Sequence, residues 1–193
     1  MTEVISFFLT NTLFLELFGF FLNMLYLFFV IKEKAVGWIW SILASIIFFW
    51  ICYNSRLYIQ AGLYAFYIFI AILGTYKWHR KPNIPITSLT KSKNVSFFFT
   101  YFLLGLIFGF VFSEYTDQSL PYLDGVISAF AVGTTLLVIS KQSENWLYWI
   151  AINLASIGLY SFQELYVLAC MSFVLLLFAV YGFMIWSKKI AID

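Results

Sequence analysis

Three residues near the end of the chain are spaced to lie along one side of a helix. Trp146, Trp149 and Asn153 follow one another at intervals of three and four residues, and an α-helix turns once in about 3.6 residues. Two indole rings can hold a flat heteroaromatic ring, and the amide of Asn153 can hydrogen-bond a polar group on it. We therefore interpret these residues as the main half of a binding site for a small molecule.

Each of these residues also has a simpler interpretation. Trp146 begins the expected helix, and aromatic residues commonly gather there as a belt at the membrane–water interface. Asn153 is equally suited to a hydrogen bond between two helices, because a buried amide in a bilayer must be paired. Tyr160 lies on the Trp149 and Asn153 side of the same helix and is a secondary candidate. The spacing leaves both interpretations open.

An earlier stretch of the chain matches a later one at a constant offset of 108 residues. Residues 13–78 lie on residues 121–186 without a gap, and Gly74 and Gly182 coincide. Trp38 falls on Trp146 in the same alignment. A duplicated hydrophobic unit within one short chain is typical of transporter folds.

The first copy carries a different face at the equivalent positions. The positions of Trp146, Trp149 and Asn153 correspond to Trp38, Ser41 and Ser45. The first tryptophan is therefore kept, and two small hydroxyl residues stand in place of the second tryptophan and the asparagine. One aromatic face and one small face could enclose an asymmetric ligand between them. The alternative is ordinary helix packing through small residues.

Two acidic residues occupy matched places near the outer ends of the first and fifth expected helices. Glu16 falls on Asp124 at the same offset, and no basic residue lies in the interior of the expected spans, since Lys77 is at the end of its span. The interior should therefore favour cations, and cation–π attraction to tryptophan acts in the same direction. The alternative is that acids in the first turns of a helix are stabilised by its dipole.

Composition identifies the class of protein that positions these residues. The chain is 63% hydrophobic and 10% charged, whereas soluble domains contain about 25% charged residues. We therefore expect an all-α integral membrane protein, and continuously apolar runs favour helices over a barrel. At roughly 20 residues per span, charge and turn breaks predict seven transmembrane helices, at about 13–31, 36–54, 57–78, 95–113, 121–140, 145–162 and 164–186.

The order of these helices predicts a 3+1+3 plan. The first three-helix repeat covers 13–78, a polar joint and a linking helix cover 79–120, and the second repeat covers 121–186. Three helices reverse the chain, so a fourth is needed before a parallel repeat can start from the same side. Gly105 and Gly109 on the linking helix have the GxxxG spacing, which indicates close packing against a neighbouring helix or subunit or arises by chance.

Lysine and arginine set the expected orientation. With seven spans, only Arg56 falls on one side, and the other side receives Lys32, Lys34, Lys77, Arg80, Lys81, Lys91, Lys93, Lys141, Lys188 and Lys189. Because basic loops stay in the cytoplasm, we expect the N-terminus outside and the C-terminus inside.

Several kinds of chemistry are not expected. The sequence contains no phosphate loop, no HExxH, no nucleophile elbow and no CxxC, so we expect neither an enzyme nor a cofactor. Cys52 and Cys170 both lie in apolar spans, where they act as small hydrophobic residues and predict no metal site. The basic residues sit beside the membrane and do not form a surface for nucleic acid.

The stretch from Glu144 to Trp186 resembles the C-terminal half of the PnuC family of nicotinamide riboside transporters. The matching residues are Glu144-Asn145-Trp146, Trp149, Asn153, Leu165-Tyr166, Gly182 and Trp186, with Leu123-Asp124 before them. The resemblance implies a fold like that of the SWEET transporters, in a bacterial inner (cytoplasmic) membrane. It also implies facilitated diffusion of a vitamin B3 precursor that a cytoplasmic kinase traps, and it leaves a homo-oligomer open.

The expected function is therefore uniport of nicotinamide riboside, a flat cation with a carboxamide. Thiamine or another flat cationic vitamin is the alternative substrate. A seven-helix receptor is the less favoured alternative, because the duplication is typical of transporters and the chain has no sizeable output domain. No site for a coupling ion is evident in the sequence.

Overall fold

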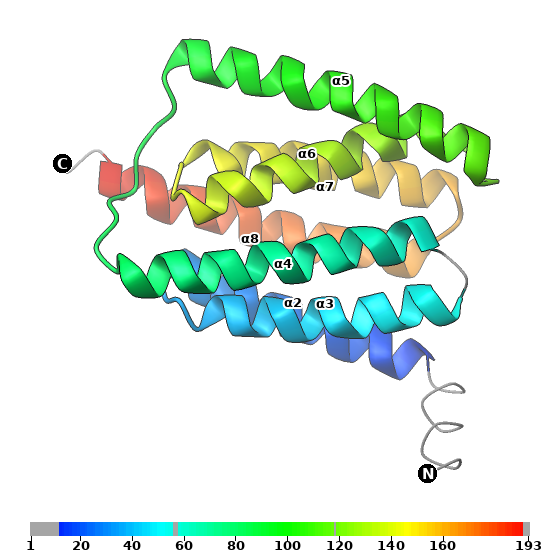
Figure 1. Cartoon of the computed structure of the whole chain (residues 1–193), viewed down its shortest axis with the longest axis horizontal. Helices are drawn as coiled ribbons and strands as arrows, with labels where there is room; N and C mark the ends of the chain where they lie inside the picture. The colour runs from blue at the N-terminus through cyan, green and yellow to red at the C-terminus, as the bar shows by residue number, and fades with distance from the viewer. Residues whose placement is uncertain (1–11, 56–57, 118, 191–193) are drawn as a thin grey trace. The chain divides into compact units, whose positions relative to one another are not determined.

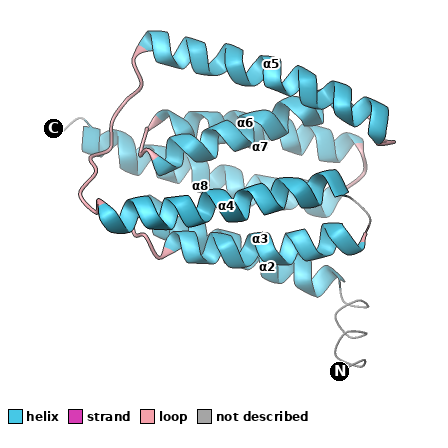
Figure 2. Ribbon diagram, viewed as in Figure 1, coloured by secondary structure: helices cyan, strands magenta, loops and turns pink. Residues whose placement is uncertain are grey.

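The computed structural model describes residues 12–55, 58–117 and 119–190. Two residues used in the sequence analysis lie outside this description. They are Arg56, which was counted in predicting the membrane orientation, and Leu57, where the third span was expected to begin. The described chain is helical apart from its loops (Figure 2), as expected for an all-α protein. In the labels of Figure 1 its seven helices are α2 (Thr12–Ile31), α3 (Gly37–Asn54), α4 (Tyr58–Arg80), α5 (Lys91–Tyr115), α6 (Pro121–Ile139), α7 (Glu144–Phe162) and α8 (Tyr166–Ile190).

Six of the seven described helices are long and apolar enough to cross a membrane, and α7 is the exception. Its length matches that of α6, but Glu144, Asn145 and Asn153 lower its mean hydropathy. The helix that carries the predicted site is therefore the one described helix whose polar residues leave it too little apolar to be recognised as a span by composition. Figure 1 shows α7 running alongside its sequence neighbours α6 and α8 within one unit.

Helix ends differ from the predicted spans where a helix continues past its apolar stretch. α5 begins at Lys91, a turn earlier than expected, because Thr90 accepts a hydrogen bond from the backbone N–H of Lys93 at 3.4 Å and caps it. α8 continues to Ile190, past Lys188 and Lys189. Basic residues are favourable there, since they face the negative end of the helix dipole.

The chain divides into two compact units, and the first contains residues 1–83. Within it, α3 packs against both α2 and α4. The Trp38 ring of α3 is wedged onto Gly74 of α4, where an added Cβ would stand 2.5 Å from its Cδ2. Trp78 meets the same ring edge-on, with centroids 5.6 Å apart. A glycine is needed at position 74 because a tryptophan face occupies the space of its side chain.

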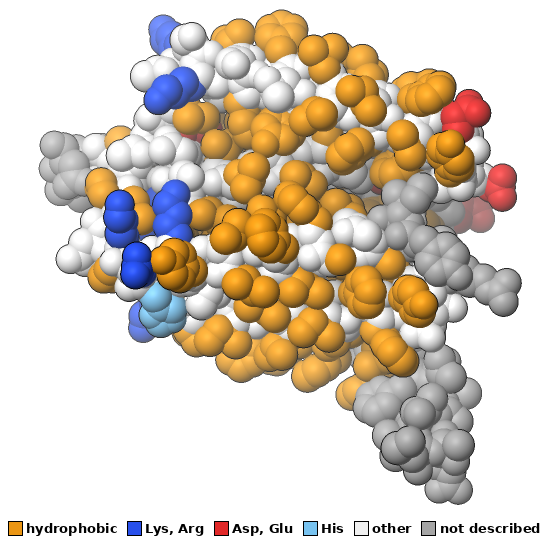
Figure 3. All heavy atoms as spheres, viewed as in Figure 1, with side chains coloured by type: hydrophobic (Ala, Val, Ile, Leu, Met, Phe, Trp, Pro, Cys, Tyr) orange, Lys and Arg blue, Asp and Glu red, His pale blue; other side chains and the backbone are white. Residues whose placement is uncertain are grey.

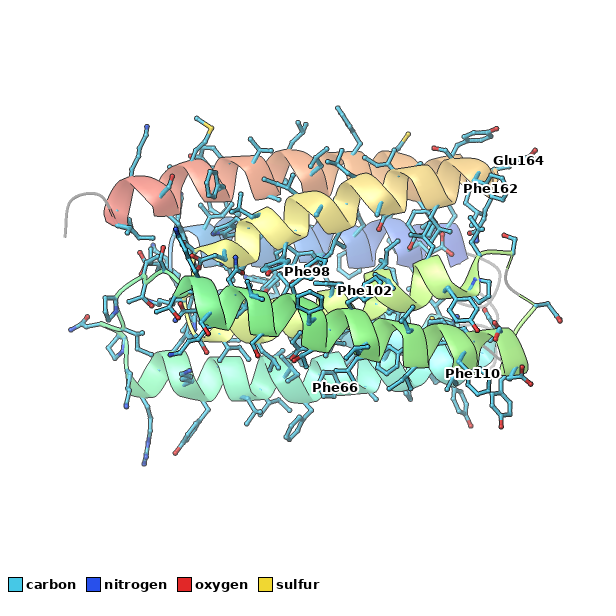
Figure 4. The ribbon with its side chains drawn as sticks, turned by 90° about the horizontal axis from the view of Figure 1, so that it is seen from above. Phe66, Phe98, Phe102, Phe110, Phe162 and Glu164 are labelled. Carbon is cyan, nitrogen blue, oxygen red and sulfur yellow. The ribbon has the colours of Figure 1, made fainter. Side chains whose placement is uncertain are left out.

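The second unit contains residues 84–193, in which α5 packs on α6, α6 on α7 and α7 on α8. Gly105 and Gly109 of α5 face Gly125 of α6, and a Cβ on Gly125 would meet the Gly105 carbonyl oxygen at 2.6 Å. The GxxxG interpretation as close helix packing is thus confirmed, with α6 as the neighbour. The aromatic side chains that α5 exposes include Phe98, Phe102 and Phe110 (Figure 4).

The loop before α5 is held to the turn between α6 and α7. The Thr87 N–H donates to the Lys141 carbonyl at 3.1 Å, and the Ser143 N–H donates to the Thr87 carbonyl at 2.9 Å. The Gln142 side chain adds a bond to the Thr87 hydroxyl at 2.9 Å. The second part of the polar joint therefore belongs to the second unit. Figure 3 shows basic side chains at one end of this unit and acidic side chains at the other.

The turn between α2 and α3 and the turn between α6 and α7 have the same internal geometry at the offset of 108. Glu33 and Lys141 both have positive φ, at 56° and 51°. Their N–H groups donate to matched carbonyls, those of Val30 and Val138, at 2.8 and 3.0 Å. The two hairpins are thus alike in backbone as well as in the tryptophans that follow them.

Candidate functional site

The predicted binding face lies on α7, which begins directly after the tight turn at Lys141. Glu144 in its first turn suits the positive end of the helix dipole. The Asn153 Nδ2 donates to the Trp149 carbonyl at 2.8 Å, one turn back along the same helix. This bond fixes the amide so that its Oδ1 is left to accept a hydrogen bond. Asn153 is buried, and the Trp149 ring is half-buried.

The structure separates the Trp146 ring from the Trp149 ring. Trp146 packs within the second unit onto Gly182 of α8, where an added Cβ would stand 2.6 Å from its Cε3. Trp186 meets it edge-on, with centroids 5.3 Å apart. Residues three apart on a helix differ by about 60° in direction, so the two indoles contact different neighbours. The ring nitrogen of Trp146 is buried and has no hydrogen-bond partner within the part of the chain that the structure describes.

Trp149 and Tyr160 instead pack against the apolar core between α6 and α7. This core consists of Ile127, Phe130, Ile152 and Leu159. Beside it, Tyr148 stacks at 5.8 Å on Phe130 and donates its hydroxyl to Asn94 Oδ1 at 2.6 Å. The bond and the rings join the start of α5 to α7. Trp149 thus lies among aromatic side chains. The helices that carry these side chains are joined both by ring packing and by the hydrogen bond from Tyr148 to Asn94.

The candidates of the first unit share α3. Trp38 is wedged against Gly74 as described, Ser45 is buried and Ser41 is half-buried. The Trp38 ring nitrogen is also buried, and residues 12–55, 58–117 and 119–190 offer it no hydrogen-bond partner. Ser41 and Ser45, the small residues expected to face a ligand, therefore lie on the same helix as Trp38. Contact between these residues and a ligand stays a prediction.

The two acids each have a partner one helix along, in matched positions. In the first unit Glu16 of α2 interacts electrostatically with Cys52 of α3. In the second unit Asp124 of α6 interacts electrostatically with Tyr160 of α7. Cys52 and Tyr160 are themselves related by the offset of 108. Each unit thus has a partly buried carboxylate beside a weakly polar side chain, which can add negative potential to its interior.

The structure also identifies buried polar residues that the helical spacing did not. Thr134 and Asn145 are fully buried, and Oγ1 of the first and Oδ1 of the second have no hydrogen-bond partner among the described residues. The signal was present in the alignment of the two copies. Thr134 falls on Tyr26 and Asn145 falls on Gly37, so a polar side chain replaces an aromatic one and a glycine.

Comparison with protein families matches a model described as nicotinamide mononucleotide transporter to residues 13–188. Among curated proteins, the chain is 22% identical over 186 residues to the nicotinamide riboside transporter PnuC of Escherichia coli strain K12, a match that covers 81% of this chain and 78% of that one. It is 23% identical over 177 residues to the PnuC of Neisseria mucosa, covering 84% of this chain and 67% of the relative.

The fold is also similar to a solved one. A crystal structure of the vitamin B3 transporter PnuC matches with a TM-score of 0.76 at 20% sequence identity. The match covers 96% of this chain and 86% of the other. At this level of identity, the likeness concerns the arrangement of the helices.

Proposed function

The chain belongs to the nicotinamide mononucleotide transporter family, and on that premise we propose that it carries nicotinamide riboside across a bacterial cytoplasmic membrane. The observation that carries the proposal is the family match over residues 13–188, which spans all seven described helices except their outermost residues. Its relatives are transporters of this vitamin precursor. No catalytic step is needed for such a role.

The binding step uses the residues of α7. Trp149 would stack on the pyridinium ring, where its π-face attracts the cation. Asn153 would accept a hydrogen bond from the ligand through Oδ1, because its Nδ2 is already held by the Trp149 carbonyl. Trp146 and Tyr160 are further candidate contacts on the same helix, and Trp38, Ser41 and Ser45 of α3 are the candidates of the first unit. Glu16 and Asp124 add negative potential that draws the cation in.

We propose further that all seven described helices cross the membrane and form two parallel three-helix repeats, at 13–78 and 121–186. What supports this is the agreement of the two hairpin turns, bond for bond, and of the two tryptophan–glycine wedges. The polar joint and α5, within 79–120, connect the repeats. The basic residues would place the N-terminus outside and the C-terminus in the cytoplasm.

The energetics would be those of a uniporter. Net accumulation then requires a cytoplasmic kinase that consumes the free ligand, and a homo-oligomer is compatible with this scheme. The membrane potential still acts on a cationic substrate, by about 2.3 kcal/mol per charge per 100 mV.

Calorimetric titration of the purified protein against nicotinamide riboside, thiamine, nicotinic acid and neutral nucleosides tests the substrate. We expect nicotinamide riboside to bind most tightly, with thiamine next. Tightest binding of thiamine would transfer the proposal to that vitamin. Absence of binding by any flat cation would contradict it.

A further inference from the structure

Three buried polar atoms of the second unit have no hydrogen-bond partner within the described structure. They are Oγ1 of Thr134, Oδ1 of Asn145 and Nε1 of Trp146. Thr134 and Asn145 are 0% exposed and Trp146 is 1% exposed, so bulk water does not reach them. Leaving a buried donor or acceptor unpaired is costly, and native proteins rarely do so. The Trp38 ring nitrogen of the first unit is likewise buried without a described partner, so the second unit differs by the Thr134 and Asn145 oxygens. These two acceptors on the neighbouring helices that also carry the Trp146 N–H indicate that a further group pairs with all three.

The duplication indicates that these three residues lie together. Their matched positions in the first unit are Tyr26, Gly37 and Trp38. There the Tyr26 and Trp38 rings have centroids 5.4 Å apart, and a Cβ on Gly37 would stand 3.1 Å from the Tyr26 carbonyl oxygen. Because the turn of each hairpin has the same hydrogen bonds and each tryptophan the same glycine wedge, the geometry carries over to the second unit.

The two units differ in what fills this place. In the first unit the Tyr26 ring packs against the tryptophan, and Gly37 contributes no side chain. In the second unit the smaller Thr134 stands at the position of the tyrosine, and Asn145 adds an amide. The Asn145 Nδ2 is held by the Gln142 carbonyl at 2.6 Å. The amide therefore presents its acceptor oxygen, while the Trp146 ring presents a donor.

We propose that Thr134, Asn145 and Trp146 form a subsite for the carboxamide of the substrate, a proposal that rests on the proposed function. The Trp146 N–H donates to the carboxamide oxygen, and Asn145 Oδ1 accepts from its NH₂ group. The Thr134 hydroxyl can do either. None of the three groups is charged, so the subsite selects a planar neutral amide. It disfavours a carboxylate, whose oxygens would meet the Asn145 oxygen without a proton between them.

The test compares two ligands on the same variants. Nicotinamide riboside has the amide NH₂, whereas 3-acetylpyridine riboside has a methyl group in its place and cannot donate to Asn145. Replacing Asn145→Leu should weaken binding of nicotinamide riboside about fivefold and leave that of the ketone unchanged. Should this variant unfold, Asn145→Gly, which introduces the first unit's residue, gives the same comparison. Thermal denaturation establishes which variants are folded.

Matched hydroxyl variants provide the control. Thr134→Val should weaken nicotinamide riboside binding, whereas Thr135→Val should not, because the Thr135 hydroxyl donates to the Ala131 carbonyl of its own helix at 2.8 Å. Equal losses for both ligands in the Asn145 variants, or no loss for either, would overturn the subsite and favour a structural water. Wild-type protein that binds no nicotinamide riboside would instead contradict the proposed function.

Discussion

The close contact between Gly182 and the Trp146 ring allows us to predict how much stability a substitution at position 182 would cost. In Gly182→Ala the new Cβ would stand 2.6 Å from Trp146 Cε3, and ordinary contacts begin at 3.4 Å. The ring must therefore move by about 1 Å, since two more of its atoms lie at 2.7 Å. Overpacking of this kind costs about 1–3 kcal/mol, and the better helix propensity of alanine returns about 1 kcal/mol. We expect a net loss of about 0–2 kcal/mol in stability.

The same displacement should weaken ligand binding, because Trp146 belongs to the proposed site. The ring N–H is the part of Trp146 left for a ligand, and a hydrogen bond from it contributes about 0.5–1.5 kcal/mol. A ring moved by about 1 Å would lose about 1 kcal/mol, or about fivefold in Kd. Calorimetry with nicotinamide riboside measures the affinity, and thermal denaturation measures the stability. Gly158→Ala on α7 is the control, because a Cβ there meets nothing within 4 Å.

Gly74→Ala provides a second comparison, since its Cβ would meet Trp38 in the same way. It should cost similar stability in the first unit. A folded Gly182→Ala variant with unchanged affinity would refute the role of Trp146 in the site. Equal stability of Gly182→Ala and Gly158→Ala would refute the wedge itself.

Three further predictions concern other parts of the molecule. Trp149→Ala should weaken nicotinamide riboside binding by about 1–3 kcal/mol in calorimetry, and unchanged affinity in a folded variant would exclude stacking on this ring. Gly125→Ala should lower the melting temperature far more than Gly62→Ala, because its Cβ meets the backbone of α5 whereas that of Gly62 meets nothing within 4 Å. Equal melting temperatures would contradict that packing. An impermeant thiol reagent should label a cysteine at position 119 and not one at position 92 in intact cells, and the reverse pattern would invert the topology.

The sequence predicts the helices well because in this chain each helix coincides with an apolar run. It predicts their ends less well, since polar residues such as Lys91 extend a helix once Thr90 caps it. The sequence shows the GxxxG pair on α5, but it does not show that Gly125 of α6 packs against this pair. The bonds between Thr87 and the α6–α7 turn join residues 54 to 56 positions apart, and no local pattern reveals such a pairing.

Ligand binding by the predicted face stays a prediction. The i, i+3, i+7 pattern selected α7, but it could not show that the Trp146 ring packs on α8. That direction depends on Gly182, more than thirty residues later. Thr134 and Asn145 were missed because neither lies in a periodic pattern. They become visible only where the two copies differ, at positions where the first copy has Tyr26 and Gly37.

Transport in liposomes that contain only this protein tests the central claim most directly. With the membrane potential clamped at zero, labelled nicotinamide riboside should enter until the inside and outside concentrations are equal and then stop. Trapping by an enclosed kinase should restore net uptake. Vesicles that take up no nicotinamide riboside would contradict the assigned substrate, and accumulation above equality driven by a proton or sodium gradient would contradict uniport.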